Sequence, residues 1–281
     1  MRPQALESPS LFASAGARVV ALKADSGEVV WRKVIPGVRL LSSPACDDGR
    51  LYMLGLDTER QSEVKIICLS ASDGVAAYTR AICGGIAPGA FGAGVALAAP
   101  LIVDGRLFVQ TGFEIAACYE ATRGRPIWAR RYGLWGGRLR GLLTGEPLPR
   151  PVVRPQAAPG GVVMAPPDAA EIILADVSGG RLIWREPSEP SLARVAAGRL
   201  VAAGERLCVY ELDDGRLLLD AALPAPASSI AADGSAVWVA APPFLVCLIV
   251  VALRLERAAD RQFGYVPALE TKSDDVQTDE E

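Results

Sequence analysis

A run rich in arginine and aromatic residues is the part of this sequence best suited to binding chemistry. Between residues 123 and 154 there are eight arginines and a single acid, Glu146, with Trp128, Tyr132 and Trp135 interleaved. Guanidinium groups bind carboxylates and phosphates through paired N–H donors, and aromatic rings stack on flat groups. The run therefore predicts an anion- or partner-binding site. Its candidate residues are Arg130, Arg131, Trp135, Arg138 and Arg140.

A second interpretation of this run is purely structural. A charged stretch is also typical of a solvated loop beside the edge of a sheet, with Trp128 committed to packing. The run stands alone, and the formal net charge of the whole chain, −3, names no partner. We expect an unidentified protein partner and no nucleic-acid partner.

Catalytic and metal-binding chemistry has little support in the composition. The chain has no histidine, which removes the commonest general base and the commonest metal ligand. Its six cysteines form no CxxC pair, and Cys68, Cys118, Cys208 and Cys247 fall inside expected strands. Thiols in such places usually serve as small buried hydrophobes. We therefore expect no catalytic residue, no metal site and no cofactor from these residues.

The elements that must position the candidate side chains are set by a repeat. Residues 18–32 contain an apolar strand, the turn Asp25-Ser26-Gly27 and a return strand with Trp31, which is the pattern of a β-hairpin. A turn glycine followed four residues later by a large apolar side chain recurs four more times. The pairs are Gly27 and Trp31, Gly74 and Tyr78, Gly124 and Trp128, Gly180 and Trp184, and Gly215 and Leu219.

A second set of hairpins alternates with the first. Each of its turn glycines precedes a short apolar strand. These glycines are Gly49, Gly105, Gly160, Gly198 and Gly234. Two alternating hairpins in a repeat of about 40–50 residues are typical of a four-stranded antiparallel propeller blade. The sequence thus predicts an all-β fold, a β-propeller of five to six blades.

The propeller is expected over residues 10–258, followed by an acidic, disordered tail over residues 259–281. The first blade lacks its opening strand. The last blade lacks the signature hairpin, because no turn glycine or aromatic residue follows Leu253 at the expected spacing. The ring is therefore either closed by the last strands or incomplete. The expected blades lie near residues 10–36, 38–82, 97–132, 151–186, 191–223 and 228–255.

Two stretches bear on membranes and export. Residues 236–253 carry no charge, but Pro242-Pro243 divide them, so we expect two buried strands and no membrane span. Residues 1–14 contain no continuous apolar segment of the kind found in a secretory signal. On that basis the chain is expected to be cytoplasmic if it is complete.

The hairpins resemble the PQQ-type propeller repeat of the quinoprotein alcohol dehydrogenase-like superfamily. The repeat of that family runs Ala-Leu-Asp-Ala-x-Thr-Gly-x-x-x-Trp, and residues 21–31 fit it closely. Its acidic position is matched by Glu120, Asp176 and Glu211 and is lost in the first two copies. The resemblance implies that one large aromatic residue docks each blade on its neighbour. The residues in that position are Trp31, Tyr78, Trp128 and Trp184.

Three functional interpretations follow from the resemblance. The first is a non-enzymatic scaffold that binds a protein or another ligand, as in bacterial propeller proteins of the cell envelope, and this analogy implies an envelope location. The second is a dehydrogenase that depends on PQQ and calcium. The adjacent cysteine pair of many such enzymes is absent, however, and no calcium ligand set can be placed. The third is a truncated propeller without independent activity. We expect the first.

Overall fold

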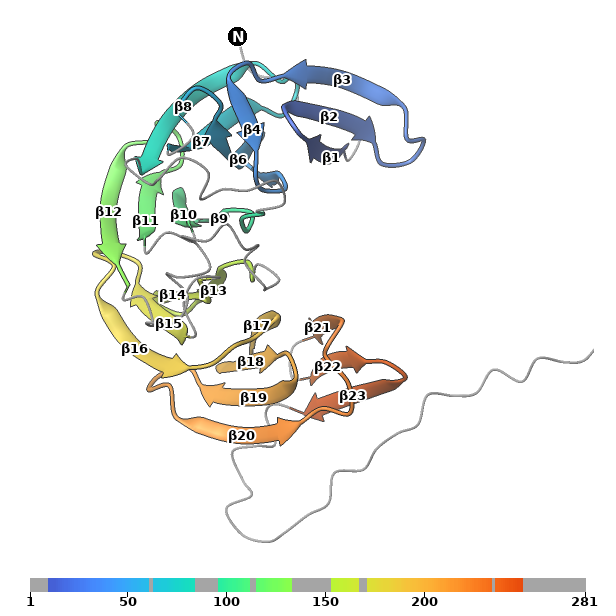
Figure 1. Cartoon of the computed structure of the whole chain (residues 1–281), viewed down its shortest axis with the longest axis vertical. Coiled ribbons are helices and arrows are strands. Elements are labelled where there is room, and N and C mark those ends of the chain that lie inside the picture. The colour runs from blue at the N-terminus through green and yellow to red at the C-terminus, as the bar shows by residue number, and fades with distance from the viewer. Residues whose placement is uncertain are drawn as a thin grey trace, which may run out of the picture.

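The computed structural model describes residues 10–60, 63–83, 96–111, 115–132, 153–166, 171–233 and 236–249. Within these residues every secondary-structure element is a β-strand, and the strands form six antiparallel sheets. Figure 1 shows the sheets arranged around an open arc, with the first sheet and the last sheet at its two ends. The prediction of an all-β propeller with five to six blades is confirmed, with six blades present.

The six blades take their strands in chain order. Blade one contains β1 (Ser10–Ala15), β2 (Arg18–Lys23) and β3 (Val29–Val34). Blade two contains β4 (Val38–Leu40), β5 (Ala45–Asp47), β6 (Arg50–Asp57), β7 (Val64–Ser70) and β8 (Ala76–Cys83). Blade three contains β9 (Leu101–Val103), β10 (Arg106–Gln110), β11 (Ile115–Glu120) and β12 (Pro126–Arg131).

The remaining three blades follow the same plan. Blade four contains β13 (Gln156–Ala158), β14 (Gly161–Met164), β15 (Glu171–Asp176) and β16 (Leu182–Pro187). Blade five contains β17 (Leu192–Ala196), β18 (Arg199–Ala203), β19 (Arg206–Glu211) and β20 (Leu217–Ala222). Blade six contains β21 (Ser229–Asp233), β22 (Ala236–Ala241) and β23 (Phe244–Ile249).

Within the described residues, the first and last blades have three strands each. In the complete blades the strand order runs from an inner strand near the centre of the arc to an outer strand on its rim (Figure 1). Blade one has its rim strand β3 but no inner neighbour for β1 among the described strands. Blade six has its inner strand β21 but no rim strand beside β23 in the same residues. No strand of blade six pairs with blade one in the described part of the chain.

A bulge interrupts the pairing of every described rim strand next to its signature side chain. In blade four Leu174 faces Trp184 and Ala175 faces Leu182, which leaves Ile183 as the extra residue. The same shift occurs in blades one, two, three and five. A bulge turns the chain and re-aims the side chains that follow it. Here it leaves Ile183 exposed on the rim and directs Trp184 into the joint with the next blade.

The core consists of five hydrophobic clusters, one at each joint between consecutive blades. Successive residues of a strand point to opposite faces of the sheet, so a blade covered on both sides must be apolar at nearly every position. The central strand β18 accordingly is buried along its whole length, and β6 is buried beyond its first residue. Each blade is therefore stabilised mainly by the blades on either side of it.

The last blade corrects one expectation from the sequence. β22 and β23 flank the Pro242-Pro243 turn as expected, but Leu245 and Cys247 are exposed and are not buried. Their face of blade six has no neighbouring blade among the described residues, whereas Cys68 and Cys118 lie in joints covered on both sides. No helix that is long and apolar enough to cross a membrane occurs in the residues described. The expected acidic tail lies outside them.

Candidate functional site

Four aromatic side chains project from the rim strands onto the next blade. Each donates a hydrogen bond to a backbone carbonyl in the turn that precedes the rim strand of that blade. The bonds run from Trp31 Nε1 to Ala71 O (2.9 Å), Tyr78 Oη to Ala121 O (2.7 Å), Trp128 Nε1 to Val177 O (3.1 Å) and Trp184 Nε1 to Leu212 O (2.8 Å). The structure thus places all four predicted docking residues at equivalent positions of successive joints.

The turn glycine of the next blade lies against each of these rings. At Gly180 the backbone φ is +65°, and an added Cβ would lie 2.5 Å from Cδ2 and Cε3 of Trp128. At Gly215 φ is +74°, and the corresponding Cβ would lie 2.8 Å from Cδ2 of Trp184. A glycine in these turns therefore serves both the backbone conformation and the close approach of the aromatic ring.

Two arginines make a second contact across the joints, which the sequence analysis missed. Arg50 donates to Thr122 O (2.6 Å), and Arg106 donates to Val177 O (2.5 Å), the same carbonyl that accepts from Trp128. Both arginines directly follow a turn glycine of the second hairpin set. That repeated Gly-Arg pair is a local signal by which they are recognisable, although only the assembled joint shows which carbonyls they reach.

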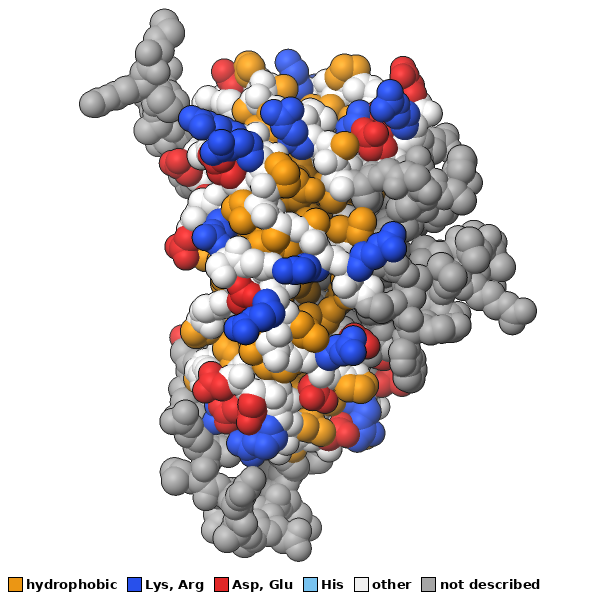
Figure 2. Space-filling view, turned by 90° about the vertical axis from the view of Figure 1, so that its left-hand side faces the viewer, with side chains coloured by type: hydrophobic (Ala, Val, Ile, Leu, Met, Phe, Trp, Pro, Cys, Tyr) orange, Lys and Arg blue, Asp and Glu red, His pale blue; other side chains and the backbone are white. Residues whose placement is uncertain are grey.

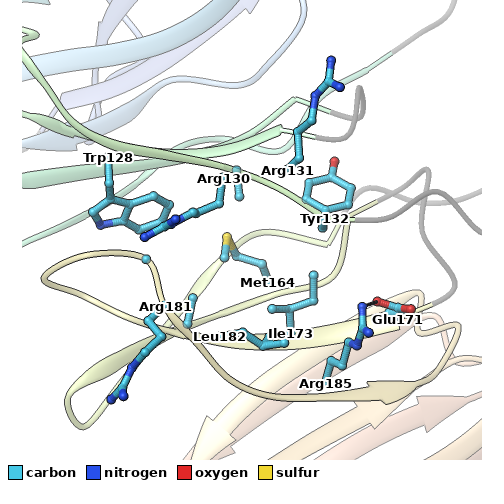
Figure 3. Close-up of a pocket in the computed structure, with 13 residues that line it drawn as sticks. Trp128, Arg130, Arg131, Tyr132, Met164, Glu171, Ile173, Arg181, Leu182 and Arg185 are labelled. Carbon is cyan, nitrogen blue, oxygen red and sulfur yellow. Dashed lines mark ion pairs between the residues drawn. The ribbon is translucent and has the colours of Figure 1, made fainter.

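A groove on the rim joins blade three to blade four, and we call it the basic groove. It has a volume of about 330 Å³. Blade three contributes Trp128, Arg130, Arg131 and Tyr132, and blade four contributes a second set of side chains. The blade-four side chains that bear on its chemistry are Glu171, Ile173, Arg181, Leu182 and Arg185. Aromatic and aliphatic groups therefore form much of its wall, with charged groups around them (Figure 3).

The charges of the basic groove are strongly unequal, with four arginines against one carboxylate. Arg185 Nη1 lies 4.0 Å from Glu171 Oε2, and Arg130 donates to Gly179 O from both Nε (3.3 Å) and Nη2 (3.2 Å). Figure 3 shows the guanidinium groups of Arg131 and Arg181 directed away from the floor, at the margins of the groove. This arrangement suits an anionic group with an apolar neighbour, since arginines bind carboxylates and also pack on flat apolar surfaces.

The predicted anion-binding residues are divided by the structure. Arg130 and Arg131 line the basic groove, together with the docking residue Trp128. Trp135, Arg138 and Arg140 lie outside the described residues. Arg181 and Arg185 were not recognisable from the charge run, because they belong to the next blade and stand about 50 residues beyond Arg131 in the chain. The correspondence between the rim strands β12 and β16 becomes visible only when the repeats are aligned with one another.

Asp176 holds the turn that receives Trp128 and Arg130. Its Oδ1 accepts hydrogen bonds from Ser178 Oγ (2.6 Å), Gly179 N (2.7 Å) and Ser178 N (2.9 Å), and its Oδ2 accepts from Arg181 N (2.6 Å). All of these bonds favour the ionised carboxylate. The hydroxyl of Ser178, followed by the backbone N–H groups, lowers the pKa of Asp176 from 3.8 to about 2.

This lowered pKa predicts a loss of stability in acid. Since the folded protein favours the ionised form, the stabilisation is present above pH 3.8 and is lost as the pH falls towards about 2. We expect Asp176→Asn to lower the free energy of unfolding at pH 7 and the difference from the parent protein to shrink towards pH 2. Urea denaturation at pH 7, 4 and 2.5 measures this, and a difference that is constant with pH would contradict it.

The described residues do not supply a donor set for a catalytic metal. No group of three or more cysteine, aspartate or glutamate side chains lies close enough together to hold an ion in the part of the chain that the structure describes. Calcium takes six to eight oxygen ligands, so isolated turn carboxylates do not fit it. No chemical step through calcium or PQQ is therefore derived for these residues.

The comparison with protein families decides the relationship that the repeats suggested. A family model described as outer membrane protein assembly factor BamB matches residues 3–82 and 66–252. The chain belongs to this family. The BamB-family match spans all six blades, and it agrees with the PQQ-like propeller repeat recognised in the hairpins. Among proteins of curated function, no sequence match to this BamB-family chain is found.

Solved structures show the same fold at low sequence identity. BamB from Moraxella catarrhalis matches with a TM-score of 0.61 and 17% identity, over 86% of this chain and 68% of that one. The computationally designed Ika8 protein matches with a TM-score of 0.62 and 10% identity, over 88% and 70%. The quinohemoprotein alcohol dehydrogenase ADHIIG from Pseudomonas putida HK5 matches with a TM-score of 0.54 and 14% identity, over 79% and 41%. At these identities the likeness establishes the fold.

Proposed function

We propose that this BamB-family propeller is a non-enzymatic scaffold that binds an acidic segment of a protein partner in the basic groove. The observation that carries the proposal is a groove with an aromatic wall that Arg130, Arg131, Arg181 and Arg185 line from two blades, with Arg131 and Arg181 at its margins. The family description names an outer membrane assembly factor, and by that analogy we propose a protein of the cell envelope as the partner.

The physical argument rests on matching a partner to the groove. Carboxylates pair with guanidinium groups through two parallel hydrogen bonds, which lysines do not offer. Trp128 and Tyr132 are mostly buried, at 8% exposure each, so the groove presents the edges of fixed rings and not mobile side chains. Rigid aromatic groups surrounded by arginines are typical of the positions that carry the binding energy of interfaces.

Charge reversal at the margin of the groove tests the proposal. The probe is a fluorescein-labelled peptide of alternating glutamate and leucine, followed by fluorescence anisotropy at low ionic strength. We expect the double variant Arg131→Glu and Arg181→Glu to raise its dissociation constant by about tenfold or more, because two attractive charge pairs become repulsive. Both side chains point away from the floor (Figure 3), so the variant is expected to fold.

The matched control is Arg32→Glu, an exposed arginine of β3 at the far end of the arc. It makes the same kind of charge change without touching the groove, and we expect it to leave the dissociation constant within twofold. If the double variant binds the acidic peptide as tightly as the parent protein does, the basic groove is not the binding site. Equal loss in the Arg32→Glu control would mean that only the net charge matters, which also contradicts the proposal.

A further inference from the structure

A second groove lies on the rim at the next joint, between blades four and five, and we call it the acidic groove. It has a volume of about 530 Å³. Blade four and the loop after it contribute Pro187, Ser188 and Glu189, and blade five contributes Glu205 and further side chains. Blade five also contributes Arg206, Cys208, Tyr210, Leu217 and Asp220 to the lining.

The two grooves are built from equivalent positions of consecutive blades. The second residue after the turn glycine is Leu182 in blade four and Leu217 in blade five, and both line their grooves. The fifth residue after that glycine is Arg185 in one blade and Asp220 in the other. Their partners across the sheet pair, Ile173 and Cys208, also correspond.

The charges at these equivalent positions are inverted. In the basic groove Glu171 on β15 lies 4.0 Å from Arg185 on β16. In the acidic groove an arginine takes the β-strand position of Glu171, and Arg206 Nε lies 2.6 Å from Asp220 Oδ1. In the preceding blade, the repeat position of Arg130 in β12 is taken by Glu186 in β16, next to the lining residue Pro187. The same two positions therefore carry an ion pair of reversed orientation at two neighbouring joints.

The lining of the acidic groove has an excess of carboxylates. Glu189, Glu205 and Asp220 stand against Arg206, and that arginine is engaged with Asp220. The floor is aromatic in this groove as well, because the ring of Tyr210 stacks on Trp184 with the centroids 6.4 Å apart and an interplanar angle of 22°. A cationic side chain with an apolar stem suits such a site, since it can bury its methylene groups while its charge remains near the carboxylates.

β16 separates the two grooves and is itself exposed. Leu182 and Ile183 are 46% and 42% exposed, and β16 pairs only with β15 among the described strands. Figure 2 shows the rim face of the arc, where basic and acidic side chains surround exposed apolar ones. β16 thus connects the two grooves, because Leu182 lines the basic groove and Pro187 lines the acidic groove.

We propose that the two grooves form one surface for a single extended segment of a protein partner. That segment carries a block of acidic residues, then apolar residues, then a block of basic residues. The acidic block occupies the basic groove, the apolar residues cover Leu182 and Ile183, and the basic block occupies the acidic groove. This proposal rests on the proposed function and adds the chemistry of the partner that the basic groove alone does not define.

Peptides of equal length test the proposal by anisotropy. One pair carries a glutamate block, an apolar spacer and a lysine block, made in both chain directions. Two further peptides serve as controls. The serine peptide has the same glutamate block and spacer followed by serines. The alternating peptide has the composition of the block peptides, but its glutamates and lysines alternate. We expect one direction of the block peptide to bind at least about tenfold more tightly than the serine peptide and the alternating peptide.

Substitutions in the acidic groove test whether this groove causes the tighter binding of the block peptide. We expect the double variant Glu189→Lys and Glu205→Lys to abolish the advantage of the block peptide while the serine peptide binds as before. The matched control is Asp25→Lys, an exposed acid in the β2–β3 turn, which is expected to leave the advantage intact. Circular dichroism of each variant confirms that it is folded.

The outcomes separate this inference from the proposed function. If the serine peptide binds as tightly as both block peptides, the basic groove functions alone and the joint surface is wrong. If the alternating peptide binds as tightly as the block peptides, binding does not depend on the order of charges in the peptide, and the proposal of a joint surface is again wrong. If none of the peptides binds, both proposals fail. Self-association of the protein that the block peptides do not inhibit would assign the surface to a second copy and would overturn the inference.

Discussion

Replacing Trp184 by alanine is expected to lower the free energy of unfolding by about 3–5 kcal/mol, the range for truncating a buried tryptophan. Trp184 is only 7% exposed and lies in the joint between blades four and five. Its indole N–H donates to Leu212 O, and its ring stacks on Tyr210. The truncation removes the ring, opens a cavity in the joint and leaves the Leu212 carbonyl without this donor. Guanidinium denaturation followed by circular dichroism measures the change.

Two further substitutions divide this effect into its parts. Trp184→Phe keeps an aromatic ring but removes the donor, and we expect a loss of about 1 kcal/mol from the hydrogen bond. Ile183→Ala changes the neighbouring bulge residue, which is 42% exposed, and we expect a change within about 0.5 kcal/mol. If Trp184→Ala were no more destabilising than Ile183→Ala, the docking role implied by the repeat would be wrong.

Gly180→Ala is expected to destabilise the protein by about 2–5 kcal/mol, for two reasons that add. Gly180 has φ of +65°, a conformation that costs an L-residue about 1–2 kcal/mol. The new Cβ would also lie 2.5 Å from the Trp128 ring, and overpacking of this kind costs about 1–3 kcal/mol. The ring is held by its bond to Val177 O, so it does not move away freely.

Gly160→Ala is the matched control for the contact with the ring. Gly160 has φ of +69°, but a Cβ there meets no atom within 4 Å. It should therefore cost only the conformational part, about 1–2 kcal/mol. In the double variant Gly180→Ala with Trp128→Ala the collision is absent, so the two effects are expected to be less than additive. Equal destabilisation by Gly180→Ala and Gly160→Ala would show that the ring contact has no energetic weight.

The docking aromatics and the basic groove differ in how far apart in the chain the residues that define them lie. The docking aromatics were recognisable because each stands four residues after a turn glycine, and a hairpin turn depends on its own few residues. The basic groove was recognisable only in part. Arg130 and Arg131 belong to a charge run visible in the chain, whereas Arg181 and Arg185 reach the groove from the neighbouring blade.

The sequence by itself determined the blade unit and the positions that repeat within it. Turn glycines, alternating apolar strands and the Gly-to-aromatic spacing are short-range features, and they predicted the hairpins and the four-stranded plan. The turn pairs Gly124 with Trp128 and Gly180 with Trp184 appear in the structure as hairpins of blades three and four. The PQQ-like repeat that they form agrees with the family match.

Only the tertiary structure decided what the repeated unit presents to a partner. The bulge that turns Trp184 inward and Ile183 outward depends on pairing with β15 and is not visible in the spacing. The inversion of charge between the two rim grooves becomes meaningful only when consecutive blades stand side by side, because each groove takes its walls from two blades. The physical reason is that hairpins form through local contacts, whereas a joint between blades depends on side chains that are far apart in the chain.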